Sequence, residues 1–162
     1  TELIQLAKAN CHTVIVDASG ALLKVAIKQK PKLIKPNKDE MFELMGVKSA
    51  TQEEMIEFAQ HLCQEGIEYV LISLGKEGAM LVSQKGVWKG LAPDVDVKST
   101  LGCGDTVVAS MCISFDEGDE PAVMLKKAIA LSSANAMTFE TAHVILKDYE
   151  ELLPRCEVET IK

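Results

Sequence analysis

Four residues of the chain, Gly102, Cys103, Gly104 and Asp105, have the types and spacing needed for phosphate chemistry. Two glycines around one small residue let bare backbone N–H groups gather at the start of a helix, where they can bind an anion. The carboxylate of Asp105 adds a proton acceptor beside that anion site. The alternative is a tight turn whose acidic residue only complements the positive end of the helix. The local sequence leaves both interpretations open, and no lysine follows the second glycine as it would in a Walker A loop.

Asn37 and Glu40 form a second candidate site. An Asn followed three residues later by a Glu is the pattern of a helix capping box, and that role is sufficient to explain the spacing. The same amide and carboxylate could also lie near a phosphate and a hydrated Mg²⁺, a metal that keeps most of its waters and few protein ligands.

A glycine loop and one polar helix residue complete the candidates. Gly75 and Gly78 follow the apolar run 69–73, which ends at Ser73. The glycines either supply the positive backbone angles of a turn or line a loop at the carboxyl end of a parallel strand, where open α/β sheets bind ligands. Asn135 could border a ligand from its helix, or it could lie on the surface.

The composition limits the classes of protein to which the chain can belong. Its 162 residues are 48% hydrophobic and 4% aromatic, which predicts one domain with a sizeable aliphatic core. A net charge of −7 argues against non-specific binding to nucleic acid or to an acidic membrane surface. The five cysteines are odd in number and lack metal-binding spacing, which predicts free thiols in a reducing cytoplasm. No apolar run approaches the roughly 20 residues that span a bilayer, and no signal peptide is expected.

Strand-like and helix-like segments alternate along the chain, which predicts a parallel α/β sheet. The run 69–73 is continuously apolar, as expected of a central strand that is covered on both faces. The runs 79–83 and 87–89 predict a β-hairpin that forms an antiparallel edge. The other predicted strands are 13–16, 32–34, 94–98 and 158–161, and the predicted helices are 2–9, 21–28, 38–45, 51–64, 106–115, 121–139 and 148–153.

Four tracts, in this order, resemble the PfkB or ribokinase-like family of carbohydrate kinases. They are Asp17-Ala18-Ser19-Gly20, Lys35-Pro36-Asn37-Lys38-Asp39-Glu40, Ser73-Leu74-Gly75-Lys76-Glu77-Gly78 and Gly102-Cys103-Gly104-Asp105. The similarity is greatest to the branch that contains 1-phosphofructokinase and tagatose-6-phosphate kinase. It implies a three-layer α/β/α fold whose mostly parallel sheet carries the hairpin at one edge.

The resemblance also implies roles for the candidate residues. Asp105 resembles the general base that takes the proton of the sugar hydroxyl as it attacks ATP, and residues 102–104 resemble the anion hole around the transferred phosphoryl. Cys103 stands where the family usually has Ala or Gly. Glu40 matches a residue linked to Mg²⁺, which we expect it to hold through water. The expected contacts to the nucleotide come from Asn37, Ser73, Gly75, Gly78 and Asn135, of which Asn135 would border the adenine.

The resemblance is to the C-terminal, nucleotide-binding half of the family's domain, and the N-terminal half with the sugar-binding segment and the lid has no counterpart in residues 1–162. We therefore expect the C-terminal portion of a cytoplasmic kinase that transfers phosphate from MgATP to a hydroxyl of a sugar phosphate, inactive as this portion alone. The expected partner is the sugar phosphate, and we expect binding to neither nucleic acid nor a membrane. The full-length protein could form a homodimer. Two alternatives stay open: a nucleotide-binding fragment without catalysis, or a related kinase for another sugar or a nucleoside.

Overall fold

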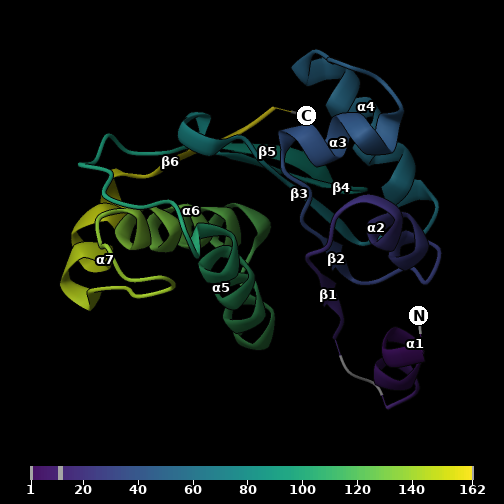
Figure 1. The fold of residues 1–162 in the computed structure, drawn as a ribbon, viewed down its shortest axis with the longest axis horizontal. Coiled ribbons are helices and arrows are strands. Elements are labelled where there is room, and N and C mark those ends of the chain that lie inside the picture. The colour runs from purple at the N-terminus through teal and green to yellow at the C-terminus, as the bar shows by residue number, and fades with distance from the viewer. Residues whose placement is uncertain (1, 11–12, 162) are drawn as a thin grey trace. The chain divides into compact units, whose positions relative to one another are not determined.

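The computed structural model describes residues 2–10 and 13–161, in which helices accompany a mixed six-stranded sheet (Figure 1). Hydrogen bonds join the strands in the order β1-β2-β3-β4-β5-β6. The chain divides into two compact units, one of residues 1–74 and 80–87 and the other of residues 75–79 and 88–162.

Three short parallel strands form the framework of the first unit. They are β1 (Ile15–Val16), β2 (Leu33–Ile34) and β3 (Tyr69–Ser73), and Leu33 lies opposite both Ile15 and Tyr69. Leu33 and Ile34 are fully buried, as are residues 70–72. The predicted central strand at 69–73 is therefore confirmed, and its continuous apolar sequence follows from burial on both faces.

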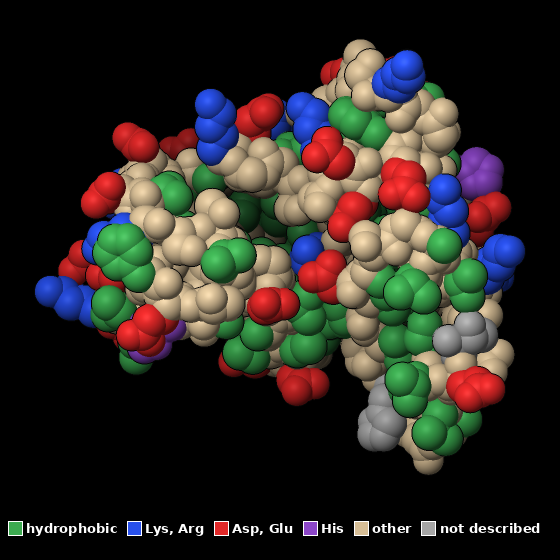
Figure 2. All heavy atoms as spheres, in the orientation of Figure 1, with side chains coloured by type: hydrophobic (Ala, Val, Ile, Leu, Met, Phe, Trp, Pro, Cys, Tyr) green, Lys and Arg blue, Asp and Glu red, His purple; other side chains and the backbone are tan. Residues whose placement is uncertain are grey.

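The described residues of the first unit form four helices, of which two start where the sequence predicts a capping box. They are α1 (Glu2–Ala9), α2 (Gly20–Ile27), α3 (Lys38–Met45) and α4 (Gln52–Gln64). Thr51 and Glu54 cap α4, which packs on β3 through an apolar stripe that includes Met55, Ala59 and Leu62. By contrast α1 buries none of its residues, and green side chains gather over α1 and α2 in Figure 2.

The hairpin strands β4 (Ala79–Ser83) and β5 (Gly86–Leu91) are joined at Gln84 and Lys85, as predicted. The terminal strand β6 (Glu157–Thr160) pairs antiparallel with β5, with Trp88 opposite Thr160. The sequence predicts the hairpin at the edge of the sheet, but β6 covers β5 and is itself the outermost strand. The strand predicted at 94–98 is wrong, because this segment runs as a loop and pairs with no strand among the described residues.

The second unit is built around two helices that lie side by side, α5 (Cys103–Glu117) and α6 (Pro121–Ala136) (Figure 1). Met111 of α5 and Leu125 of α6 are fully buried, so the apolar core of this unit lies between them. The shorter α7 (Leu146–Leu152) packs against α6, and the 3₁₀ turn η2 (Leu153–Arg155) follows it. The observed ranges of both helices differ from the predicted ones. Helix α5 starts three residues earlier than predicted, and α6 ends three residues earlier.

The surface and the thiols agree with the composition. The described cysteines Cys63, Cys103, Cys112 and Cys156 are free thiols, as predicted, and Cys11 lies outside the described residues. Acidic and basic side chains are interspersed over the face shown in Figure 2. Within the described ranges, no helix is both long enough and apolar enough to cross a membrane.

Candidate active site

Gly102 starts helix α5 of the second unit in a conformation that requires glycine. Its φ of +80° and ψ of −4° lie in the left-handed region, which costs other residues free energy. A Cβ at this position would also overlap the backbone nitrogen of Ala142, in the loop that follows α6. A structural reason alone therefore explains this glycine, and it places the turn directly against that loop.

The first turn of α5 presents free backbone donors. The N–H of Cys103 donates to the carbonyl of Thr100 over a long 3.3 Å, whereas the N–H groups of Gly104 and Asp105 have no acceptor among the described residues. Free donors at the positive end of a 15-residue helix favour a bound anion. The turn can therefore hold a phosphate, with Gly104 and Asp105 offering the freest donors.

Asp105 is the third residue of α5, and its side chain is exposed. No ion pair or side-chain hydrogen bond engages its carboxylate within the part of the chain that the structure describes. The carboxylate is thus available to accept a proton from a bound hydroxyl. This arrangement agrees with the role that the sequence predicts for Asp105.

Asn135 lies in the last turn of α6 and is fully buried. Its amide nitrogen Nδ2 donates to the carbonyl of Leu101 at 2.9 Å and to Sγ of Cys103 at 3.2 Å. The Cys103 thiol donates in turn to the carbonyl of Ser132 at 3.5 Å. The structure therefore brings Asn135 together with the turn that contains Gly102, Cys103 and Gly104.

In the first unit, three predicted site residues meet at the carboxyl ends of β2 and β3. Asn37 forms an isolated parallel bridge with Ser73, and the N–H of Ser73 donates to the carbonyl of Pro36 at 3.1 Å. The predicted capping box is confirmed, since the N–H of Glu40 donates to Asn37 Oδ1 and the N–H of Asn37 donates to Glu40 Oε2, both at 2.9 Å. The carboxyl ends of parallel strands are where open α/β sheets bind ligands.

The described residues at this edge suit a Mg²⁺ ion that keeps its waters, and do not form a metal site made of protein ligands alone. The capping box uses Oε2 of Glu40 and leaves Oε1 for another ligand. Among the described residues, no group of three or more His, Cys, Asp or Glu side chains could hold a metal ion. One free carboxylate oxygen suits a metal that keeps its waters and binds through them.

An ion pair that the sequence analysis missed lies at the same edge of the sheet. Lys35 directly follows β2 and Asp17 directly follows β1, and Nζ of Lys35 lies 3.0 Å from Oδ2 of Asp17. The Lys35 side chain is 7% exposed and that of Asp17 is 34% exposed. The sequence signal that could have predicted this pair is a lysine directly after a buried strand, because lysines are rarely buried without a partner.

Gly75 and Gly78 belong to the second unit and bound the 3₁₀ turn η1 (Gly75–Glu77). Both have positive φ values, +61° and +91°, and the N–H of Gly78 donates to the carbonyl of Gly75 at 3.0 Å. A Cβ at Gly78 would overlap the carbonyl of Gly90, whereas Gly75 has open space around it. Gly78 is thus required by packing, and the space at Gly75 remains available to a ligand.

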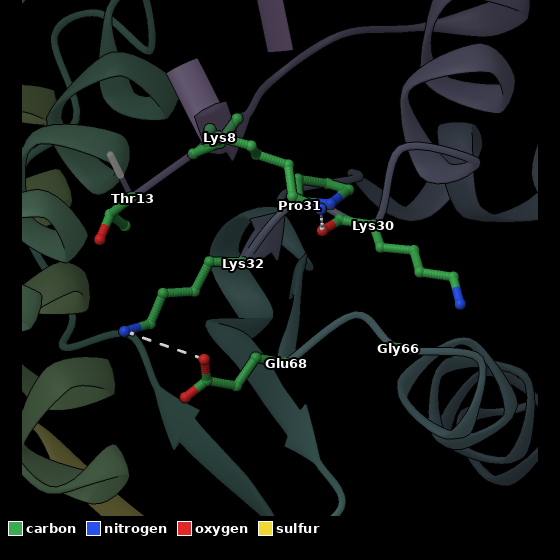
Figure 3. A pocket seen from close by; sticks show the side chains of 8 residues that line it. Lys8, Thr13, Lys30, Pro31, Lys32, Gly66 and Glu68 are labelled. Atoms are coloured by element: carbon green, nitrogen blue, oxygen red, sulfur yellow. Dashed lines mark hydrogen bonds and ion pairs between the residues drawn. The ribbon is translucent and has the colours of Figure 1, made fainter. Parts of the chain in front are cut away.

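A cavity of about 350 Å³ lies elsewhere in the first unit (Figure 3). Lys32 and Glu68, which line it, precede β2 and β3, so the cavity lies at the amino ends of the strands, opposite the candidate residues. These two side chains form an ion pair at 3.8 Å, and Nζ of Lys8 donates to the carbonyls of Gln29 and Lys30. The charges of Lys8 and Lys32 thus have protein partners, and the cavity is separate from the candidate site.

The comparison with protein families decides the class of the chain. Residues 1–147 match the family described as pfkB family carbohydrate kinase. The chain belongs to this family. Among its pfkB relatives, a 1-phosphofructokinase of Borreliella burgdorferi is 30% identical over 154 residues, covering 94% of this chain and 50% of the relative. A 1-phosphofructokinase of Escherichia coli is 36% identical over 132 residues, covering 80% of this chain and 42% of the relative.

Solved pfkB-type structures share the fold. The Escherichia coli phosphofructokinase-2 in complex with potassium superposes with a TM-score of 0.89 at 27% identity, over 95% of this chain and 50% of that one. The Arabidopsis thaliana ribokinase complexed with ribose and ATP gives a TM-score of 0.79 at 26% identity, over 93% of this chain and 51% of that one. The predicted ribokinase-like fold is thereby confirmed as a partial domain, and the chain spans about half the length of the curated relatives that it matches.

Proposed function

We propose that this chain is the nucleotide-binding and phosphoryl-transfer portion of a kinase that uses MgATP to phosphorylate a hydroxyl of a phosphorylated ketohexose. Membership of the pfkB family supports a sugar kinase. The names of the relatives favour fructose 1-phosphate as the acceptor over tagatose 6-phosphate. The observation that carries the proposal is the start of α5, where an exposed carboxylate at Asp105 lies beside N–H groups that have no acceptor in the described part of the chain.

In this proposal Asp105 acts as the general base. Its carboxylate accepts the proton of the sugar hydroxyl while the hydroxyl oxygen bonds to the γ-phosphorus of ATP. The bond from that phosphorus to the bridging oxygen breaks, and ADP leaves. The donors of residues 102–105 stabilise the charge on the transferred phosphoryl, which is the main task of the protein in phosphoryl transfer.

The other predicted site residues bind the nucleotide and its metal. Asn37, Ser73 and Gly75 would contact the nucleotide at the loops where their strands end, with Gly78 shaping the loop and Asn135 bordering the adenine. When Mg²⁺ is bound, it neutralises phosphate charge, and Glu40 would hold it through water from its free Oε1. Residues 1–162 by themselves are proposed to bind the nucleotide without catalysing transfer, because they span about half of their relatives.

An assay of acceptor specificity in the intact protein, with any sequence that precedes Thr1 or follows Lys162, tests this function. ADP release with MgATP would be compared for fructose 1-phosphate, tagatose 6-phosphate, ribose and adenosine. We expect the highest kcat/KM for a phosphorylated ketohexose. A preference for ribose or adenosine would instead support the related-kinase alternative, and nucleotide binding with no acceptor turned over would support a binding protein without catalysis.

A further inference from the structure

We infer that Asn135 is a positioning residue that orients the anion-binding turn at the start of α5. This inference rests on the proposed function, because it gives a catalytic purpose to a contact within the second unit. The contact joins two helices: the amide of Asn135 at the end of α6 donates to Leu101 at 2.9 Å and to Cys103 at 3.2 Å, on the two sides of Gly102.

The hydrogen bond to Leu101 determines the direction of the next N–H. In a planar trans peptide the carbonyl of one residue and the N–H of the next point in opposite directions. Because the Leu101 carbonyl faces Nδ2 of Asn135, the N–H of Gly102 faces away from α6. This N–H has no acceptor among the described residues, so the same contact that holds the turn also leaves a donor free for an anion.

The turn needs such an external support because its own conformation is costly. Gly102 has a positive φ, Leu101 is exposed, and among the described residues the N–H of Cys103 makes only the long 3.3 Å bond to the carbonyl of Thr100. The backbone of Ala142 fills the space that a Cβ at Gly102 would need. The turn is thus in contact both with the last turn of α6 and with the loop that follows it.

The burial of Asn135 agrees with a role beyond stability. The side chain is fully buried, yet its Oδ1 has no hydrogen-bond partner among the described residues. An unpartnered buried carbonyl oxygen destabilises a fold, and an apolar side chain of similar shape would avoid that cost. The amide nitrogen is the part of the side chain that makes contacts, and both of its contacts are to the turn.

The test replaces Asn135 in the intact protein by Leu, which has a similar shape and no donor. We expect kcat to fall at least about tenfold, since small displacements of a catalytic group cost large factors in rate. The melting temperature should change little, and the KM for ATP should change by a smaller factor than kcat, because the Asn135 side chain is fully buried against the turn. Hydrogen exchange of the amides of 101–105 should become faster, because the turn has lost its support. Ser133→Ala, a change at a buried residue of the same helix, is the control and should alter neither kcat nor the hydrogen exchange of residues 101–105.

The outcome separates this inference from the proposed function. If Asn135→Leu matches Ser133→Ala in both kcat and exchange, Asn135 does not position the turn, while the kinase assignment stands. If the unaltered protein phosphorylates no acceptor, the proposed function fails, and exchange alone still decides whether Asn135 holds the turn. Should Asn135→Leu not fold, Asn135→Ser is decisive, because serine stays polar but is too short to reach Leu101, and it should show the same loss.

Discussion

Nζ of Lys35 lies 3.0 Å from Oδ2 of Asp17, at the ends of two neighbouring parallel strands. The two charges differ in exposure, since the ammonium is almost fully buried and the carboxylate keeps about a third of its surface in water. The pair therefore predicts unequal effects when one partner is removed. A buried charge left without its partner is strongly destabilising, whereas an exposed one is stabilised by water.

We expect Asp17→Asn to lower the free energy of unfolding by about 2–3 kcal/mol, because it leaves the Lys35 ammonium buried without a counterion. Lys35→Met should cost about 1 kcal/mol or less, because the remaining carboxylate is partly hydrated and the new side chain is apolar. Urea denaturation of the intact protein measures both. Equal losses, or a larger loss for Lys35→Met, would contradict this account of the pair.

The two glycines that bound α5 should differ sharply in their tolerance of alanine. Gly102 and Gly118 have similar positive φ values, +80° and +72°, so alanine is strained at both. Of the two, only Gly102 would bring a new Cβ onto backbone, that of Ala142, because no described residue lies within 4 Å of a Cβ at Gly118.

We expect Gly118→Ala to cost about 1–2 kcal/mol from the left-handed conformation alone. Gly102→Ala should cost about 3 kcal/mol or more, because overpacking adds to the same conformational cost. The difference between their free energies of unfolding measures the close approach of Ala142. Similar losses for the two variants would show that the loop after α6 moves aside freely.

A cluster around Lys127 should make stability depend on pH. Its Nζ lies 2.7 Å from Asp119 and 2.6 Å from Glu117, and the hydrogen bond from Lys127 lowers the pKa of Asp119. A lowered carboxyl pKa contributes stability above the unfolded value, near 4, and that stability is lost as pH falls through the folded value. The hydrogen bonds to Asp119 and Glu117 raise the pKa of Lys127, so the lysine contributes its full share of stability up to about pH 10.

Lys127→Met should therefore reduce stability by at most about 1 kcal/mol at pH 7 and flatten the fall in stability between about pH 5 and pH 3. Unfolding measured across that pH range checks the result. Lys126→Met, at the neighbouring position of α6, serves as the control and should retain the acid dependence of the unaltered protein. An unchanged slope in Lys127→Met would exclude the cluster as its source.

The thiols should react in an order determined by burial. Burial raises the pKa of Cys63 to about 11 and also raises the pKa of Cys156, which keeps both as inert thiols at neutral pH. Cys112 is exposed. We expect iodoacetamide at pH 8 to modify Cys112 quickly and Cys63 and Cys156 only after unfolding, as read by mass spectrometry. Fast labelling of Cys63 in the native protein would contradict its burial.

Local patterns were sufficient to predict most helices and strands of the first unit. Helix α3 runs over the predicted residues 38–45, because the Asn37–Glu40 box and the αL glycine at Gly46 mark its two ends locally. The strand at 69–73 could be predicted because its continuous apolar run reflects burial on both faces. The same local signals pointed to the candidate turn at 102–105.

Interactions with distant segments decided the rest. Val95 and Val97 suggested a strand at 94–98, but the N–H of Lys98 donates to the carbonyl of Ala136 at 2.8 Å, which satisfies the end of α6 and not a strand partner. Likewise, the contact of Asn135 with Leu101 joins residues 34 positions apart. No local pattern distinguishes a buried asparagine that makes such a long-range hydrogen bond from a polar surface residue.

The most direct test of the central claim is the kcat of Asp105→Asn in the intact protein, measured with MgATP and its best sugar phosphate. We predict a fall of about 100- to 10,000-fold, the usual contribution of a general base, with the Kd for ATP changed by less than about twofold. Asp116→Asn, at an exposed acid in the last turn of the same helix, is the matched control and should retain normal turnover. Near-normal turnover in Asp105→Asn would contradict the assignment of Asp105 as the base.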